Sequence, residues 1–145
     1  MDALQPFVTA IDHVGIAVPD LDEAIAFYRD TLGLELTHEE VNEGQGVREA
    51  MMSAPGDGGS AVQLLAPLTP ESTIAKFIGR SGPGLQQLAF RVTDIEAATA
   101  ALRAKGLRVL YDEAISGTAG SLANFVHPKD TGGVLIELVQ PAHQL

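Results

Sequence analysis

Apolar and polar positions along this chain follow a pattern that occurs twice. Residues 11–34 and 85–107 share the same order of an alternating apolar stretch, an acidic residue and a helical apolar stripe. A constant offset of 74 positions carries Asp20 onto Asp94 and Arg29 onto Arg103. A pattern repeated at a fixed offset predicts a duplicated structural unit.

The first copy predicts the element order βαβββ. Its alternation predicts a strand over 11–18. Asp20, with Glu23 three residues later, predicts the start of a helix that ends at Gly33. Three further strands are predicted, with a hairpin loop at APGDGGS before the last of them: 34–40, 47–53 and 61–66.

The second copy predicts the same order, with a helix over 94–104 behind Asp94. Its predicted strands are 85–92, 107–112, 121–126 and 134–140. Between the copies, Thr69 is expected to cap a short helix that ends near Arg80.

The fold class predicted is therefore α+β, with two tandem βαβββ modules whose curved sheets enclose a central cleft. One domain of 145 residues is expected, with modules at about 11–67 and 85–141 and a linker at 68–84. Alternate strand residues would project into the cleft.

Composition narrows the classes of function. The chain has no cysteine, which excludes a disulfide framework, a thiolate nucleophile and a cysteine-based zinc site. Its formal net charge of −10 argues against nucleic acid or an anionic membrane as a partner, since both need a basic surface. It lacks an apolar run long enough to span a bilayer and a signal-peptide pattern, so a cytoplasmic location is expected.

Polar residues inside the apolar strands indicate a metal site. Glu137 is the only charged residue in GVLIELVQ, and an isolated buried carboxylate is costly unless a cation accompanies it. The repeat carries Gln63 onto Glu137 and His13 onto Gln87. A lone strand histidine is commonly a hydrogen-bonded core residue, and amide oxygens are weak ligands. The repeat that places all four favours a metal.

This donor set does not select one metal. One imidazole, two amide oxygens and one carboxylate suit Co²⁺, Mn²⁺, Mg²⁺, Ni²⁺ or Zn²⁺. Glu49 is a separate candidate, because its counterpart in the repeat is Ala123 and the carboxylate breaks the symmetry. The alternative for Glu49 is a solvent-facing residue paired with Arg48.

Several segments carry a resemblance to a known family. IDHVGIAVPDLDEAIAFY and GPGLQQLAFRV resemble the vicinal-oxygen-chelate superfamily, which includes glyoxalases, bleomycin-resistance proteins and dioxygenases. NEGQGVREAMM and HPKDTGGVLIEL resemble, within it, the methylmalonyl-CoA epimerase family. The resemblance covers nearly the whole chain, from Ile11 to Pro141.

The resemblance implies a reaction. A divalent metal, with Co²⁺ the first expectation, would be held by His13, Gln63, Gln87 and Glu137. The (R) and (S) forms of methylmalonyl-CoA would interconvert by proton abstraction alpha to the thioester, through a metal-stabilised enolate. Glu49 and Glu137 would be the two acid/bases. A homodimer and a place in propionate metabolism are also implied.

Two positions depart from the family pattern, and other functions stay open. The family commonly has His at Gln87 and often Arg at Leu122. Lys76 is a candidate contact for coenzyme A phosphates, although exposed lysines usually serve solubility. A glyoxalase-type lyase or isomerase and a non-catalytic binding protein are the alternatives. An iron dioxygenase is disfavoured because His13 is the single histidine of the set.

Overall fold

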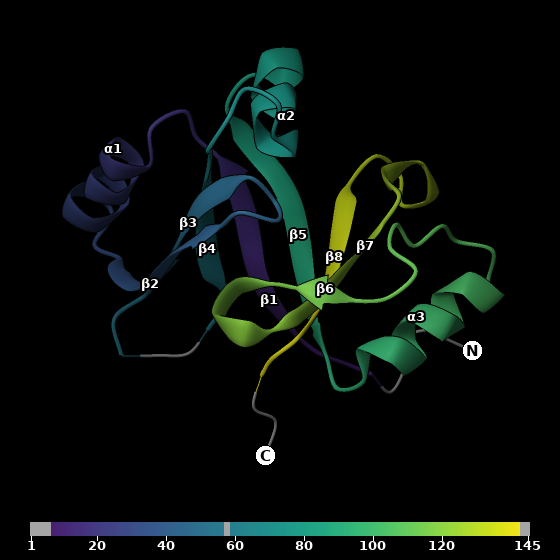
Figure 1. Ribbon diagram of the computed structural model, residues 1–145. Helices are drawn as coiled ribbons and strands as arrows, with labels where there is room; N and C mark the ends of the chain where they lie inside the picture. Colours follow the sequence, from purple (N-terminus) through teal and green to yellow (C-terminus); the bar gives the residue numbers. More distant parts are fainter. Residues whose placement is uncertain (1–6, 57–58, 143–145) are drawn as a thin grey trace. The chain divides into compact units, whose positions relative to one another are not determined.

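The computed structural model describes residues 7–56 and 59–142, and the chain divides into two compact units (Figure 1). The first unit is His13–Gln86, and the second unit comprises Met1–Asp12 and Gln87–Leu145. Each unit pairs a helix-covered sheet with a core of its own. No helix within the described ranges is long and apolar enough to cross a bilayer.

The first unit contains the elements of the first repeat. In chain order they are β1 (Val8–Ala17), α1 (Leu21–Ala26), the π-helical turn η1 (Phe27–Thr31), β2 (Glu35–Asn42), β3 (Val47–Ser53), β4 (Ala61–Pro67) and α2 (Thr73–Ser81). The first residues of β1 belong to the second unit. The strand order is β2-β3-β4-β1, with β1 and β4 parallel and the other neighbours antiparallel.

The second unit repeats this arrangement with shorter outer strands. Its elements are β5 (Gly84–Val92), α3 (Ile95–Ala104), β6 (Ile115–Ser116), the 3₁₀ turn η2 (Thr118–Gly120), β7 (Leu122–Val126), the 3₁₀ turn η3 (Pro128–Asp130) and β8 (Leu135–Gln140). The strand order is β5-β8-β7-β6, and β5 and β8 are parallel. The predicted βαβββ order and the α+β class are confirmed.

The strand registers confirm the duplication residue by residue. In the parallel pair of the first unit, His13 lies opposite Ala61. In the second unit, Gln87 lies opposite Leu135, and both residues are 74 positions further along. The antiparallel pairs agree as well, with Glu49 opposite Leu65 in one unit and Ala123 opposite Val139 in the other.

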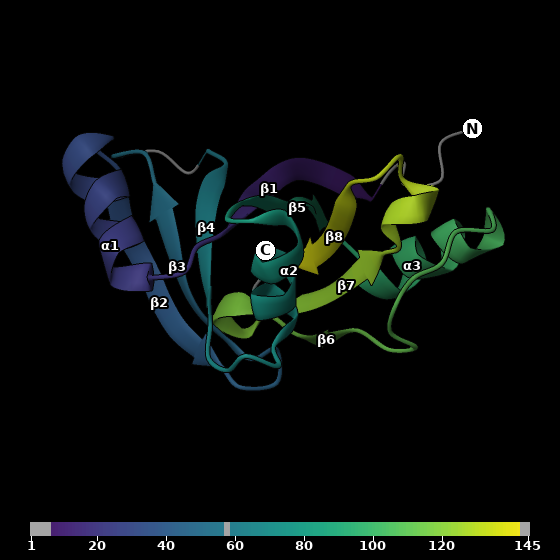
Figure 2. The same ribbon diagram turned by 90° about the horizontal axis from the view of Figure 1, so that it is seen from above.

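Both covering helices begin at the predicted aspartates. Asp20 Oδ1 accepts a hydrogen bond from the Glu23 N–H at 3.0 Å, and Asp94 Oδ1 accepts one from Ala97 N–H at 3.1 Å. Figure 2 shows α1 beside β3 and β4 and α3 beside β7 and β8, as their contacts require. The two cores match in composition: Leu21, Ile25, Ala50, Met52 and Leu64 in one, and Ile95, Ala98, Leu102, Val126 and Leu138 in the other.

The linker helix begins later than predicted. Thr69 is not its cap: Ser72 Oγ accepts a hydrogen bond from Ala75 N–H at 3.1 Å, and Thr69 contributes only its carbonyl to the preceding turn. Ser72 is buried beside Gly46, where an added Cβ would lie 2.8 Å from the Ser72 Cβ. Gly46 also has φ +69°, so the NEGQG turn requires glycine there for space and for conformation.

The strand predicted over 107–112 is wrong. Val109 alone forms a β-bridge, to Val126, and no strand is assigned there. The pairing ends at Tyr111 because the Asn124 side chain takes both of its main-chain groups. Asn124 Oδ1 accepts from Tyr111 N–H at 3.1 Å, and Asn124 Nδ2 donates to the Tyr111 carbonyl at 3.0 Å.

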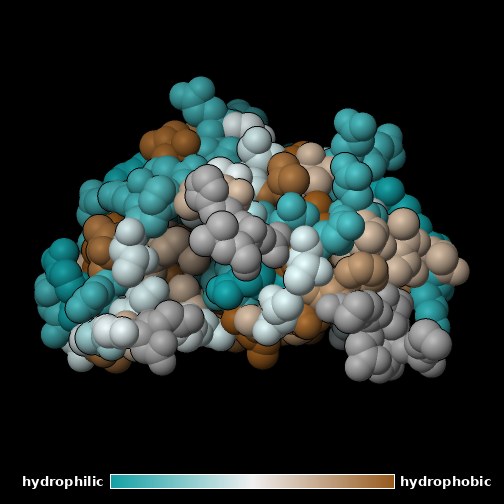
Figure 3. Space-filling view, turned by 90° about the horizontal axis from the view of Figure 1, so that it is seen from below, coloured by the Kyte–Doolittle hydropathy of each residue, from teal (hydrophilic) through white to brown (hydrophobic). Residues whose placement is uncertain are grey.

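The visible surface mixes hydrophilic and hydrophobic residues, with small apolar areas among polar ones (Figure 3). The exposed apolar side chains include Leu36 and Val41 on β2, which stands at the end of the strand order. An edge strand with exposed apolar residues can pair with another chain.

Candidate active site and metal ligands

The first unit places His13 and Gln63 on one face of its sheet. His13 lies opposite Ala61, which is two residues before Gln63 on β4, and residues two apart on a strand share a face. Both side chains are buried, each only 3% exposed. The repeat predicted this pair from spacing, and the structure brings the two residues to the same part of the sheet.

The second unit holds the corresponding pair, Gln87 and Glu137. Gln87 lies opposite Leu135, two residues before Glu137 on β8. Glu137 is buried at 6% exposure, and Gln87 is half-buried. The Gln87 amide donates a hydrogen bond from Nε2 to Glu137 Oε1. The predicted burial of a carboxylate in the middle of β8 is confirmed.

Glu49 also lies inside the first unit and not on its surface. It is 4% exposed on β3, and Gln63 Nε2 donates a hydrogen bond to Glu49 Oε2 at 3.1 Å. Arg48 turns instead to Asp22, at 3.3 Å from Nη2 to Oδ1. The alternative of a solvent-facing Glu49 paired with Arg48 is therefore wrong. At the matching position of the second unit lies the small, buried Ala123.

An amide donating to a carboxylate occurs in both units, and it orients the amide. Because Nε2 of each glutamine faces a carboxylate, the carbonyl oxygen Oε1 is the atom with which Gln63 or Gln87 would bind a cation. Imidazole, amide oxygen and carboxylate oxygen are all donors that divalent metals accept. The donor groups of these four residues are therefore chemically suited to a divalent ion. In the described part of the chain, no three His, Asp or Glu side chains form a metal cluster, so the amides are needed.

The Arg108–Asp130 ion pair holds the HPKD turn. Arg108 donates to both Asp130 carboxylate oxygens, at 3.0 Å from Nε and 2.9 Å from Nη2. The Arg108 guanidinium holds the pKa of Asp130 well below its usual range, first through these hydrogen bonds and also through the main-chain N–H of Arg108. His127 Nδ1 accepts from the Lys129 N–H at 3.1 Å, so this histidine braces the turn.

Lys76 lies exposed on α2, one helical turn before Arg80. Arg80 lies over the Phe77 ring, with its guanidinium carbon 5.8 Å from the ring centre. These positions are compatible with an anionic ligand. Lys76 as a phosphate contact therefore stays a prediction.

Sequence reasoning did not single out Gln86, the neighbour of Gln87 on β5. Gln86 Oε1 is buried, and it has no hydrogen-bond partner within residues 7–56 and 59–142. The two adjacent glutamines are visible in the sequence, but the repeat offset carries His13 onto Gln87 and gives no reason to select Gln86. Asn124 was also missed, because a polar residue in a short strand gives no sign that its side chain will pair with main chain.

Comparison with known proteins agrees with this fold and these motifs. Residues 12–125 match the model of the Glyoxalase/Bleomycin resistance protein/Dioxygenase superfamily. An ethylmalonyl-CoA/methylmalonyl-CoA epimerase of Cereibacter sphaeroides is 39% identical over 132 residues, which is 90% of this chain and 96% of that protein.

Two solved structures are similar over almost the whole chain. The crystal structure of methylmalonyl-CoA epimerase from Mycobacterium tuberculosis has 57% sequence identity and a TM-score of 0.90, and the match covers 94% of this chain and 90% of that one. A methylmalonyl-CoA epimerase in complex with methylmalonyl-CoA and NH₄⁺ has 48% identity and a TM-score of 0.88, and covers 93% and 96%.

Proposed function

The chain belongs to the glyoxalase/bleomycin resistance protein/dioxygenase superfamily, and from this membership we propose that it is a methylmalonyl-CoA epimerase. The reaction interconverts the (R) and (S) forms of an acyl-CoA whose reactive carbon lies between a thioester and a carboxylate. The observation that carries the proposal is the buried Glu49, held by Gln63 in a chain that matches epimerases over nine-tenths of its length.

Glu49 is the first proton carrier in this proposal. Its ionised carboxylate removes the proton from the reactive carbon, and the electron pair left behind moves to the thioester oxygen to form an enolate. The hydrogen bond from Gln63 Nε2 fixes the position of the Glu49 carboxylate. A positioned base of this kind contributes about 10²–10⁴-fold to the rate.

Glu137 is the second proton carrier. Inversion requires that one proton is removed from one face of the carbon and a different proton is delivered to the opposite face. A second acid/base is therefore needed. Protonated Glu137 delivers its own proton to the opposite face of the carbon while Glu49 keeps the proton it removed, and the enolate electron pair forms the new C–H bond of the other epimer. Gln87 holds the Glu137 carboxylate by its hydrogen bond.

The proposed metal ligands are His13, Gln63, Gln87 and Glu137. Superfamily members commonly use a divalent metal, and Co²⁺ is the ion we propose here, with Mn²⁺, Mg²⁺, Ni²⁺ and Zn²⁺ as alternatives. When bound, a divalent ion supplies Lewis-acid stabilisation of the negative charge on the enolate, worth several kcal/mol. Support for these ligands comes from the family motifs and from the burial of His13, Gln63 and Glu137, with Gln87 half-buried and hydrogen-bonded to Glu137.

The coenzyme A portion is proposed to contact Lys76. An exposed ammonium group attracts phosphate, and Lys76 and Arg80 lie four residues apart on α2. The acyl group accepted is proposed to be methylmalonyl. The Cereibacter relative is named for ethylmalonyl-CoA as well, so this larger acyl group is the first alternative substrate to test.

Assembly and location are further proposals. A homodimer is supported by the exposed apolar residues Leu36 and Val41 on the edge strand β2. We also propose a cytoplasmic location, and a role in propionate metabolism that follows from the proposed substrate.

The test is direct conversion of a single epimer. Purified protein loaded with Co²⁺ is incubated with one epimer of methylmalonyl-CoA, and the other is measured with a stereospecific coupling enzyme. We expect an equal mixture to form. A loaded, folded protein that leaves both methylmalonyl-CoA and ethylmalonyl-CoA unchanged would show that the function is different.

A further inference from the structure

Strand β2 carries a histidine and a glutamate on one face of the first sheet. A hydrogen bond joins His38 Nε2 to Glu40 Oε1 at 2.5 Å, and residues two apart on a strand share a face. The residue between them, Glu39, projects from the opposite face, where its Oε1 lies 3.9 Å from Arg48 Nη2. The proposed reaction uses neither His38 nor Glu40.

This pair lies next to the proposed base. In the antiparallel pairing of β2 with β3, Glu40 is directly opposite Glu49, and His38 is opposite Met51. Opposite residues project from the same face, with Cβ atoms about 4.5–5.5 Å apart, and like charges in such a pair are destabilising. A proton held between the two carboxylates relieves this repulsion.

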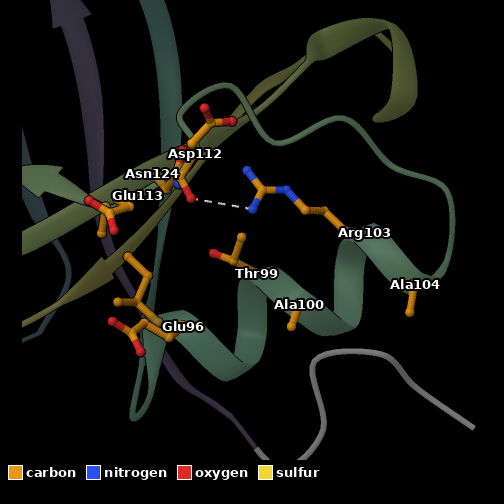
Figure 4. A pocket seen from close by; sticks show the side chains of 10 residues that line it. Glu96, Thr99, Ala100, Arg103, Ala104, Asp112, Glu113 and Asn124 are labelled. Carbon is orange, nitrogen blue, oxygen red and sulfur yellow. Dashed lines mark hydrogen bonds between the residues drawn. The ribbon is translucent and has the colours of Figure 1, made fainter.

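The second unit supplies a control inside the same chain. At the position of the proposed base it has Ala123, and the apolar Ile115 lies opposite. The offset of 74 carries His38 onto Asp112, which lies outside the strands. Figure 4 shows Asp112 beside Arg103, whose Nη1 donates to the Asp112 carbonyl at 3.5 Å. The histidine–glutamate pair therefore accompanies the buried glutamate of β3 and is not a requirement of the fold.

The proposed reaction leaves a proton that must be removed from Glu49. Each conversion ends with Glu49 protonated and Glu137 ionised, whereas the next conversion in the same direction needs an ionised Glu49. Glu49 is 4% exposed, so its carboxylate has little direct access to solvent. The side chains of Glu40 and His38 are 28% and 39% exposed, and they form a path of increasing exposure away from Glu49.

We propose that Glu40 and His38 form a proton relay that returns Glu49 to its ionised form after each conversion. Glu49 passes its proton to the Glu40 carboxylate, and Glu40 passes a proton to His38 Nε2. The imidazolium releases a proton to water or buffer, while Glu137 takes up one proton from solvent. Imidazole both accepts and releases protons near neutral pH. The relay rests on the proposed function and acts through Glu49, without contact with the substrate.

Steady-state rates of the full-length, metal-loaded protein test the relay. One epimer is converted at low buffer concentration, and His38→Gln is compared with wild type. Glutamine can still form a hydrogen bond with Glu40, but it cannot carry a proton. We expect kcat to fall by about tenfold or more. The ratio kcat/KM should stay near the wild-type value, because it reports proton removal by protein that is already ionised at Glu49.

Rescue by a small base separates a relay from a structural role. His38→Ala, on the edge strand β2, opens a place for free imidazole next to Glu40. Added imidazole should raise the kcat of this variant toward the wild-type value, since the free base replaces the missing acceptor. The same concentration should leave wild type unchanged, which controls for an effect of imidazole on the metal.

Glu40→Gln and Glu39→Gln make the same chemical change at adjacent positions on opposite faces of β2. Glu40→Gln should lower kcat as His38→Gln does, and Glu39→Gln should not. An equal fall of kcat and kcat/KM without rescue by imidazole would show a structural role and overturn the relay.

The outcomes also separate the relay from the proposed function. Wild-type kcat in both His38→Gln and Glu40→Gln would overturn the relay and leave the epimerase activity standing. A folded, metal-loaded wild-type protein that converts neither epimer would overturn the proposed function and the relay together.

Discussion

Gln63 donates a hydrogen bond from its amide nitrogen to the carboxylate of Glu49 at 3.1 Å, and both side chains are buried. The bond joins β4 to β3 in the first unit. The second unit places Glu137 and Ala123 at the corresponding positions, so the amide–carboxylate pair there is made by Gln87 and Glu137 instead. The duplication therefore keeps a buried carboxylate in each half, but on different strands.

Replacement of Glu49 by Gln should remove catalysis and leave the metal in place. The amide cannot take up a proton from the substrate, so turnover should fall by about 10²–10⁴-fold. Metal content, measured by elemental analysis of the purified variant, should stay at the wild-type level, because Glu49 is not one of the proposed ligands.

Glu39→Gln is the matched control, since Glu39 is exposed on the neighbouring strand β2. It should retain wild-type turnover. Turnover in Glu49→Gln as high as in this control would refute the role of Glu49.

Removal of metal by a chelator should abolish epimerisation while the protein stays folded. The stripped protein should regain activity on addition of Co²⁺, with smaller recovery from other divalent ions. His13→Ala should not recover to the same extent, because it removes the buried imidazole that we propose as a metal ligand. Full activity in demonstrably metal-free protein would show that the reaction does not require a metal.

Replacement of Gln87 by His should strengthen metal binding. Imidazole nitrogen is a better ligand than an amide oxygen for Co²⁺ or Zn²⁺, and an affinity gain on the order of tenfold is expected. Competition with a coloured chelator measures it. Gln86→His, at the adjacent position on β5, is the control, and an equal gain there would mean that Gln87 is not a ligand.

The ion pair of the HPKD turn predicts a pH-dependent contribution to folding. Arg108 lowers the pKa of Asp130 in the folded protein, so the pair stabilises the fold above the unfolded value of about 3.9. This contribution is lost as the pH falls toward the lower, folded-state pKa. Asp130→Asn should therefore be less stable than wild type at neutral pH, and the difference should shrink in acid.

Denaturant midpoints measured between neutral pH and about pH 2 test this expectation, because the contribution begins to fall once the pH drops below the unfolded value of about 3.9. Asp22→Asn is the control. It removes an exposed carboxylate whose ion pair with Arg48 is longer, at 3.3 Å. A difference for Asp130→Asn that does not change with pH would show that charge is not the cause.

The paired polar positions could be predicted from the sequence because their signal lies in a repeat. Spacing alone predicted that His13 and Gln63 would share a face, and strand registers that match between the units confirm it. The aspartate caps at Asp20 and Asp94 were predicted for the same reason, since a local side-chain bond needs no tertiary information.

The failures concern residues whose partners are distant in sequence. The predicted strand over 107–112 is replaced by a single bridge because Asn124, more than ten residues later, pairs with the Tyr111 main chain. Thr69 and Ser72 are both good caps by composition, and the helix uses Ser72, which lies beside Gly46 in the fold. Neither contact is visible in a local pattern.

Hydrogen exchange at the reactive carbon of the substrate shows whether proton removal requires both Glu49 and the metal. Methylmalonyl-CoA is incubated in D₂O with metal-loaded protein, with metal-stripped protein and with the Glu49→Gln variant, and deuterium at that carbon is measured by mass spectrometry. We expect rapid incorporation of deuterium by the metal-loaded wild-type protein alone. Incorporation at the same rate by the stripped protein or by the variant would contradict it.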